Sequence, residues 1–167
     1  MRIIAYVTIM LVLLLVQSTL ISFIQVWGAK PDLPMVFALC MSMIRGEKIG
    51  AVTGFFNGFL EDILFGRFIG LNTIVKSATS YILGYGSRNI YKGPAILTMI
   101  LVFLGSIIYN ILFMFLAFLT NEINRPWYFF LPIAIPSSFL NMIISPIIYF
   151  AVSKLERFFD YYFDIKY

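Results

Sequence analysis

The sequence predicts an all-α integral membrane protein with about six transmembrane helices, forming one transmembrane domain over residues 1–167. The first observation is composition: 61% of the residues are hydrophobic and 12% are charged, whereas a soluble domain has about 25% charged residues. The mean hydropathy is +0.94. A soluble core of this size would leave many of the 18 Phe and 10 Tyr facing water, while lipid accommodates exposed apolar side chains.

The second observation is that short polar turns divide the chain into apolar blocks. Six blocks are predicted to be helices, at 3–24, 33–44, 49–65, 71–85, 95–119 and 127–152. The second block is too short to span a bilayer alone, so we expect it to be tilted, extended by its flanks or buried among the others. The sixth block contains Pro132, Pro136 and Pro146, which predict a kinked or broken helix.

The third observation is that Lys and Arg lie mostly on one side of the predicted bundle. If the six blocks alternate in direction, one side holds Arg2, Arg45, Lys48, Arg88, Lys92, Lys154, Arg157 and Lys166. The other side holds Lys30, Arg67 and Arg125. Because the positive-inside rule places the basic side in the cytoplasm, both termini are predicted to be cytoplasmic. A five-span alternative, with blocks two and three as a re-entrant pair, would break this alternation.

Residues 154–167 have a different pattern, which predicts a cytoplasmic amphipathic tail after a helical bundle of residues 1–153. Four apolar residues recur at helical spacing: Leu155, Phe158, Phe159 and Tyr162. Charged residues occupy another face: Lys154, Arg157, Asp160 and Asp164. We expect this tail to lie in the membrane interface.

Three glycines follow one another at four-residue intervals in the third block: Gly50, Gly54 and Gly58. Such spacing of small residues lets another backbone approach closely. Asp62 continues the series, and because each step of four turns about 40° around a helix, the positions form a slanting stripe. The stripe is either a packing groove that ends in a charged site or, as we favour for the glycines alone, ordinary packing within the chain.

Glu61 and Asp62 form the only adjacent acidic pair in the chain. A carboxylate near the hydrocarbon is costly and is kept mainly where it pairs or faces a cavity. Our hypothesis is that Asp62 faces inward and pairs with Lys76, while Glu61 points about 100° away, toward headgroups or a partner. The alternative is that both acids lie beyond the helix end in water.

Several residue types that catalysis and metal binding use are missing or isolated. Histidine is absent and Cys40 is the single cysteine. The absence of histidine excludes catalytic triads that contain His and metal sites built on His, the commonest transition-metal ligand. A single cysteine excludes a metal site built on a Cys cluster. No nucleophile motif or phosphate loop accompanies Glu61 and Asp62. The basic residues form no cluster or stripe for nucleic acid. We therefore expect a non-enzymatic protein with no catalytic residues, no cofactor, no metal and no nucleic-acid partner.

A set of motifs over about residues 17–71 resembles the MreD family, small membrane proteins of the bacterial rod-shape system. The motif residues are, in order, Gln17, Ser18, Pro31, Asp32, Leu33, Arg45, Gly46, Gly50, Gly54, Phe55, Gly58, Asp62, Gly70 and Leu71. Each motif alone is weak, while their order and spacing together are fairly specific. Length agrees over the whole chain, and the second half matches in hydropathy alone.

The resemblance implies a non-enzymatic subunit of the cell-elongation machinery in the bacterial cytoplasmic membrane. Its expected partners are MreC, a single-span protein, and, through the complex, the peptidoglycan polymerase and transpeptidase pair. We expect the turn at Pro31 and Asp32 and the region 62–71, which includes Gly70, to form the surface that faces MreC.

The MreD family is also similar to the substrate-binding components of energy-coupling-factor vitamin transporters, which have six helices and a similar size. A vitamin transporter component is therefore the second hypothesis. Against it, those components typically carry an Ala-xxx-Ala surface on the first helix, where this chain has only Ala5, and few polar groups are available for a pocket. The third hypothesis, an intramembrane enzyme, would need Glu61 and Asp62 as an acid pair.

Overall fold

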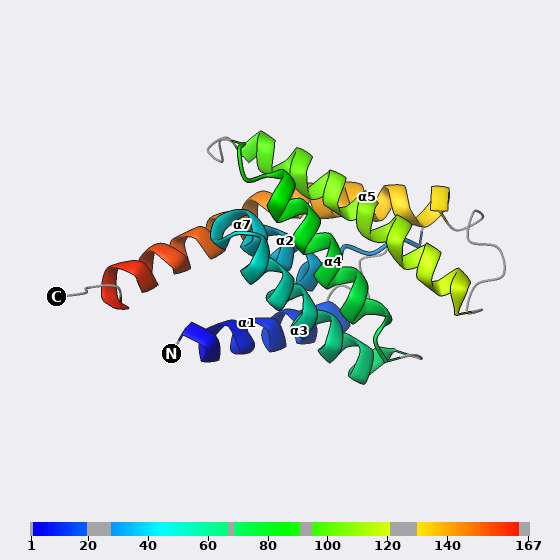
Figure 1. Cartoon of the computed structure of the whole chain (residues 1–167), viewed down its shortest axis with the longest axis horizontal. Helices are drawn as coiled ribbons and strands as arrows, with labels where there is room; N and C mark the ends of the chain where they lie inside the picture. Colours follow the sequence, from blue (N-terminus) through cyan, green and yellow to red (C-terminus); the bar gives the residue numbers. More distant parts are fainter. Residues whose placement is uncertain (1, 20–27, 67–68, 91–94, 121–129, 164–167) are drawn as a thin grey trace.

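The structure is a computed structural model that describes residues 2–19, 28–66, 69–90, 95–120 and 130–163. Within these ranges the elements are α1 (Arg2–Thr19), α2 (Leu33–Arg45), α3 (Glu47–Phe65), α4 (Leu71–Gly86), α5 (Ala95–Leu119), the π-helical turn η2 (Phe130–Ala134) and α7 (Ile135–Phe163). The all-helical prediction is confirmed (Figure 1). Among the residues that the structure describes, two helices are long and apolar enough to cross a membrane, Ala95–Leu119 and Pro132–Tyr161, and two apolar helices are shorter, Ile4–Thr19 and Leu33–Arg45.

Helix α2 is the centre of the structure. The carboxylate of Asp32 caps its N-terminus by accepting the N–H of Met35 at 2.9 Å, and Pro34 lies in the first turn, where a missing N–H costs no helical bond. Nearly every side chain of α2 is buried, because α1, α3, α4, α5 and α7 all contact it. At 1.5 Å per residue the helix is about 20 Å long, less than the about 30 Å of a bilayer core. Burial among the other helices, one of the three predicted possibilities, therefore accommodates the short second block.

Helices α3 and α4 make the most extensive contact in the bundle. A Cβ added at Gly58 would lie 2.5 Å from the carbonyl of Asn72, and one at Gly54 would lie 2.6 Å from the carbonyl oxygen of Lys76. A side chain larger than hydrogen would therefore push the two helices apart. Gly50 lies instead against α2. The slanting glycine stripe thus faces two neighbouring helices of the same chain.

Helix α7 packs on α5 and α2. It follows η2, which contains Pro132, and it passes through Pro146 without a break. The hydroxyl of Ser145 donates to the carbonyl of Met142 at 2.8 Å, which is the carbonyl that Pro146 leaves without its helical N–H. The sixth block is therefore a π-helical entry followed by one continuous helix, and the predicted start at Trp127 lies outside the described residues.

The predicted amphipathic tail is not a separate helix, because α7 continues through this segment. Its division into faces also differs from the prediction. Phe159 is buried against the ring of Tyr6 on α1, whereas Phe158 is exposed, so two residues predicted on one apolar face lie on different sides. The side chain of Tyr162 and the whole of Asp164 lie outside the described part of the chain.

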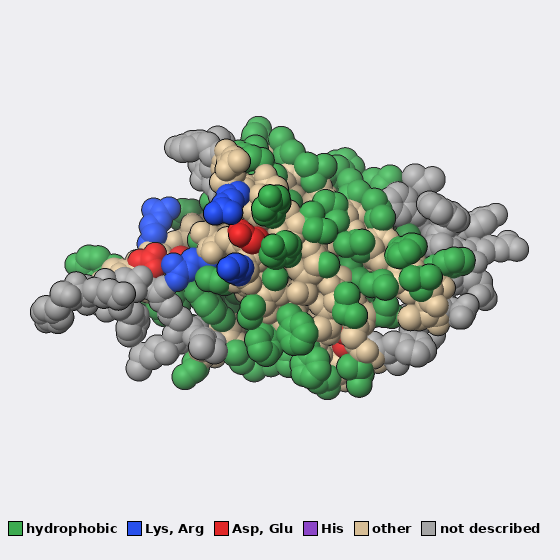
Figure 2. Space-filling view, in the orientation of Figure 1, with side chains coloured by type: hydrophobic (Ala, Val, Ile, Leu, Met, Phe, Trp, Pro, Cys, Tyr) green, Lys and Arg blue, Asp and Glu red, His purple; other side chains and the backbone are tan. Residues whose placement is uncertain are grey.

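One end of the bundle, called the basic end below, carries a group of Lys and Arg side chains with acidic side chains among them (Figure 2). Helix α1 begins and α7 ends at this end (Figure 1), and Figure 2 shows that the Lys and Arg side chains of the visible face gather there. This distribution agrees with the one-sided excess in the sequence. Arg67 and Arg125, counted on the opposite side, lie outside the described residues.

Candidate functional site

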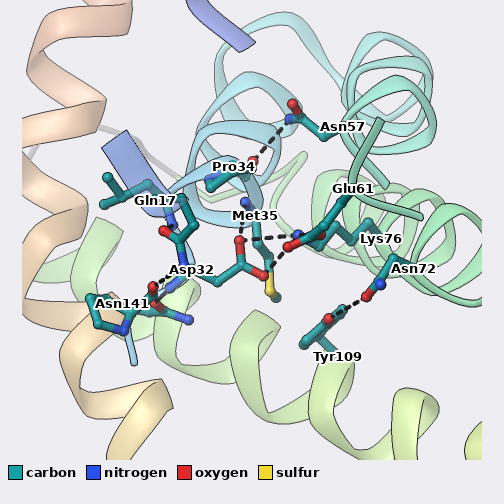
Figure 3. Close-up of polar contacts among 12 residues, drawn as sticks. Gln17, Asp32, Pro34, Met35, Asn57, Glu61, Asn72, Lys76, Tyr109 and Asn141 are labelled. Carbon is teal, nitrogen blue, oxygen red and sulfur yellow. Dashed lines mark hydrogen bonds and ion pairs between the residues drawn. The ribbon is translucent and has the colours of Figure 1, made fainter. Parts of the chain in front are cut away.

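A buried ammonium group joins three helices inside the bundle. The side chain of Lys76, on α4, is 0% exposed, and its Nζ lies 2.8 Å from Oδ2 of Asp32, which precedes α2. The same Nζ pairs with the carboxylate of Glu61 on α3. It also lies 5.8 Å from the ring centroid of Tyr109 on α5, within cation–π range. Asp32, Glu61 and Lys76 are called the Lys76 cluster below (Figure 3).

The Lys76 cluster contains two carboxylates and one ammonium group. The side chains of Asp32 and Glu61 are 18% and 19% exposed, so the acids keep a small contact with the surroundings while the ammonium has none. Removing a charge from water is costly unless an opposite charge and hydrogen bonds replace the water. The cluster therefore holds α2, α3 and α4 in one arrangement, because separating them would leave charges buried and unpaired.

The turn that carries Asp32 is held by side chains from two further helices. The N–H of Asp32 donates to Oδ1 of Asn141 on α7 at 2.7 Å. Gln17 of α1 donates from Nε2 to the carbonyl of Pro31 at 2.7 Å and accepts the N–H of Leu33 at 3.1 Å. Motif residues of α1 and of the start of α2 are thus in direct contact (Figure 3).

Asp62 has a different role from the one predicted. It is 1% exposed, and its carboxylate accepts the N–H groups of Gly70 at 2.9 Å, Asn72 at 3.1 Å and Thr73 at 2.9 Å, and the hydroxyl of Thr73 at 2.7 Å. It therefore caps the N-terminus of α4, where unpaired N–H groups and the helix dipole favour a negative charge. Gly70, with a φ of 115°, makes the turn that precedes this helix.

The predicted pair of Asp62 with Lys76 is therefore wrong, and Glu61 is the acid of α3 that reaches the ammonium. Adjacent helical residues point about 100° apart, so a single face of α3 cannot direct both acids at one group. The prediction that Glu61 points toward headgroups or a partner is also wrong, because its carboxylate pairs with Lys76 inside the bundle. The alternative, with both acids beyond the helix end in water, also fails, because α3 continues to Phe65 and Asp62 is buried.

A second charge network lies at the basic end of the bundle. Arg45, the last residue of α2, pairs through Nε with Oε2 of Glu156 at 3.1 Å and through Nη1 with Oδ1 of Asp160 at 3.3 Å. Glu156 is buried and accepts the hydroxyl of Tyr6 on α1. These four residues are called the Arg45 network below. Helix α2 is thus held by charged groups at both of its ends.

A comparison with protein-family models decides which family these features belong to. The model described as rod shape-determining protein MreD matches residues 1–159. The chain belongs to the MreD family. The comparisons with curated proteins and with solved structures found no match. The match covers the second half of the chain as well, where the sequence motifs were lacking.

MreD family membership makes this chain a non-enzymatic membrane protein with a role in rod-shape determination. Within the described residues, no three Asp, Glu or Cys side chains gather as metal ligands. The charged groups inside this MreD family member bind one another and the backbone, so they hold helices together.

Sequence reasoning missed two partners of the charged residues, Tyr109 and Glu156. The interhelical hydrogen bonds of Asn141 are the ones expected of a polar side chain inside an apolar block. The hydroxyl of Tyr109 donates to Oδ1 of Asn72 at 2.9 Å, beside the Lys76 cluster. A polar side chain inside an apolar block must find a partner, and this rule was the available signal for Tyr109 as well. Glu156 gave no such signal, because it stands between charged residues that predicted a solvated face.

Proposed function

We propose that this MreD family member is a non-enzymatic subunit of the bacterial cell-elongation complex. It assembles with an MreC-like single-span protein and, through the complex, with the peptidoglycan polymerase and transpeptidase pair. Family membership supports the part played in rod shape. The observation that carries the assembly role is that the Lys76 cluster and the Arg45 network are paired internally. Partners are therefore met through exposed helix faces.

The proposed location is the bacterial cytoplasmic membrane, crossed six times with both termini in the cytoplasm. Two observations support it: α1 begins and α7 ends at one end (Figure 1), and Lys and Arg side chains gather at that end (Figure 2), as the positive-inside rule requires of a cytoplasmic side. A reporter fused after Tyr167 that is active only outside the cytoplasm should stay silent. Activity of that reporter would reverse the proposed orientation.

The likeness to the energy-coupling-factor component fold stays a prediction.

The surface proposed to face MreC needs a correction from the one predicted. The carboxylates of Asp32 and Asp62 are engaged inside the bundle, so they cannot provide that surface. The same region exposes large apolar side chains around the end of α3 and before α4: Ile63, Leu64, Phe65 and Ile69. We place the contact with the partner's membrane helix on these residues, because contacts between helices in lipid depend on packing.

Co-purification with MreC tests this surface. The double variant Ile63→Ala/Ile69→Ala should lose most of the co-purified MreC and should fail to restore rod shape to cells that lack the native protein. The matched control is Ile96→Ala/Ile100→Ala, which removes the same side chains from an exposed face of α5. Equal retention of MreC by both variants would show that the contact does not lie at the end of α3. Failure of the unaltered protein to retain MreC would overturn the proposed function itself.

The polar side chains in and around the Lys76 cluster do not favour the alternative of a vitamin transporter component. A binding pocket needs polar groups left free for the ligand, whereas Asp32, Gln17, Asn72 and Asn141 are bonded to other groups of the chain. A vitamin that remained bound through purification would restore this alternative.

A further inference from the structure

The last three turns of α7 have one buried side and one exposed side. Val152, Glu156 and Phe159 are buried, and Phe159 packs on α1. The opposite side exposes two cations and two aromatic rings: Lys154, Arg157, Phe158 and Tyr161. At 100° per residue these four positions fall within an arc of about 100°. They are called the basic-aromatic face below.

The neighbouring acids do not neutralise the basic-aromatic face. Glu156 and Asp160 lie on the side of α7 that meets α2, where both pair with Arg45. Within the described residues, Lys154 and Arg157 have no ion-pair partner. The Arg45 network therefore engages both acids at the end of α7: Glu156 is buried, and Asp160, whose side chain is 47% exposed, pairs with Arg45, while Lys154 and Arg157 are exposed.

The length of α7 places this face at the membrane surface. The helix runs from Ile135 to Phe163, 29 residues, which is about 43 Å at 1.5 Å per residue. The hydrocarbon core is about 30 Å thick. When the apolar part of α7 fills the core, the last three turns necessarily reach the headgroup layer at the basic end (Figure 2).

We propose that the basic-aromatic face binds the phosphate headgroups of anionic phospholipids. Lys154 and Arg157 lie one turn apart and present their charges to phosphate groups, since basic side chains beside a membrane attract anionic lipids. Phe158 and Tyr161 flank the cations and occupy the interface, the level at which aromatic rings are enriched. The bound lipids fix the depth of α7 and, through the Arg45 network, the position of α2. This lipid site does not depend on the proposed assembly with MreC.

The test uses the purified full-length protein in a neutral detergent, titrated with dioctanoyl phosphatidylglycerol and, separately, dioctanoyl phosphatidylcholine. The unaltered protein should bind the anionic lipid at least tenfold more tightly than the zwitterionic one. Lys154→Gln/Arg157→Gln should weaken binding of the anionic lipid by roughly fivefold per cation removed, which corresponds to about 1 kcal/mol each. Binding of the zwitterionic lipid should not change.

The matched control is Lys48→Gln/Arg88→Gln, which removes the same charge from exposed positions outside the basic-aromatic face. It should change binding of the anionic lipid less than twofold. An equal loss in both double variants would show a general effect of net charge and would overturn the site. Equal binding of the two lipids by the unaltered protein would overturn it as well.

Two further arms separate lipid from other anions. Inorganic phosphate should compete with phosphatidylglycerol only at concentrations at least 100-fold higher. Tyr161→Ala should weaken binding of the lipid without affecting binding of inorganic phosphate. If phosphate competes as well as the lipid, the face is a site for the free anion. If an acidic peptide binds more tightly than the lipid and displaces it, the occupant is a protein segment. Either result contradicts the proposal.

Discussion

Replacing Lys76 with methionine tests whether the buried ammonium holds the bundle together. Methionine keeps most of the side-chain volume but leaves the carboxylates of Asp32 and Glu61 facing one another without a cation. Removing one partner of a buried pair costs about 3–5 kcal/mol. Because both acids keep about a fifth of their side-chain surface exposed, we expect the lower end of that range, about 3 kcal/mol.

Cys40 provides the assay for this loss. It is the only cysteine and is buried in the middle of α2, so a maleimide reaches it only when the bundle opens. Under conditions in which opening and closing are fast, the alkylation rate follows the population of open molecules. A loss of about 3 kcal/mol corresponds to roughly a 100-fold faster reaction in Lys76→Met. The exposed substitution Lys154→Met should leave the rate unchanged.

A combined variant separates lost charge from lost packing. In Lys76→Met/Glu61→Gln/Asp32→Asn no uncompensated charge remains, and asparagine still caps α2. We expect this variant to recover most of the lost stability, since replacing a whole buried ion pair is often nearly neutral. Wild-type alkylation of Lys76→Met would refute the structural role of the ammonium. A combined variant that reacts as fast as Lys76→Met would assign the loss to packing instead.

Three other substitutions have expected outcomes. Asp62→Ala leaves the first N–H groups of α4 without an acceptor and should cost about 2–4 kcal/mol, seen as faster alkylation of the buried cysteine; an unchanged rate would mean that water replaces the cap. Gly58→Ala should separate α3 from α4 and cost about 1–3 kcal/mol by the same assay, while the control Gly86→Ala, whose added Cβ meets open space, should cost less than about 0.5 kcal/mol. Glu156→Gln should loosen the end of α7 and increase the rate of trypsin cleavage after Arg157 several-fold; cleavage at the wild-type rate would show that the Arg45 network does not hold this end.

The sequence was sufficient to place most helices, because glycine, proline and charged residues mark their ends. Prediction and structure agree closely for α3, α4 and α5, each bounded by such residues. The end of α7 was placed wrongly because a change of pattern was taken as a change of element. A helix that leaves the membrane changes its residue types without changing its backbone, and only the buried Phe159 and Glu156 show which face still packs.

The members of the candidate site could be predicted, but their pairing could not. The cost of burying charge identified Glu61, Asp62 and Lys76 as residues that need partners. Which acid meets the ammonium depends on the rotation of α3 relative to α4, which the close approach at Gly54 and Gly58 sets. The second acid of the cluster, Asp32, reaches Lys76 only because α2 lies between the other helices, an arrangement that no local pattern contains.

The central position of α2 has a consequence for the order in which the protein is made. Helix α2 emerges from the ribosome early, yet the side chains that bind its two ends, Asn141 and Glu156, belong to the last helix. Until that helix is synthesised, α2 is shorter than the bilayer is thick and has incomplete partners for its polar ends. The early segments therefore cannot have their final packing when they first enter the membrane. The final packing forms only when α7 contacts α2, a central helix that was synthesised much earlier.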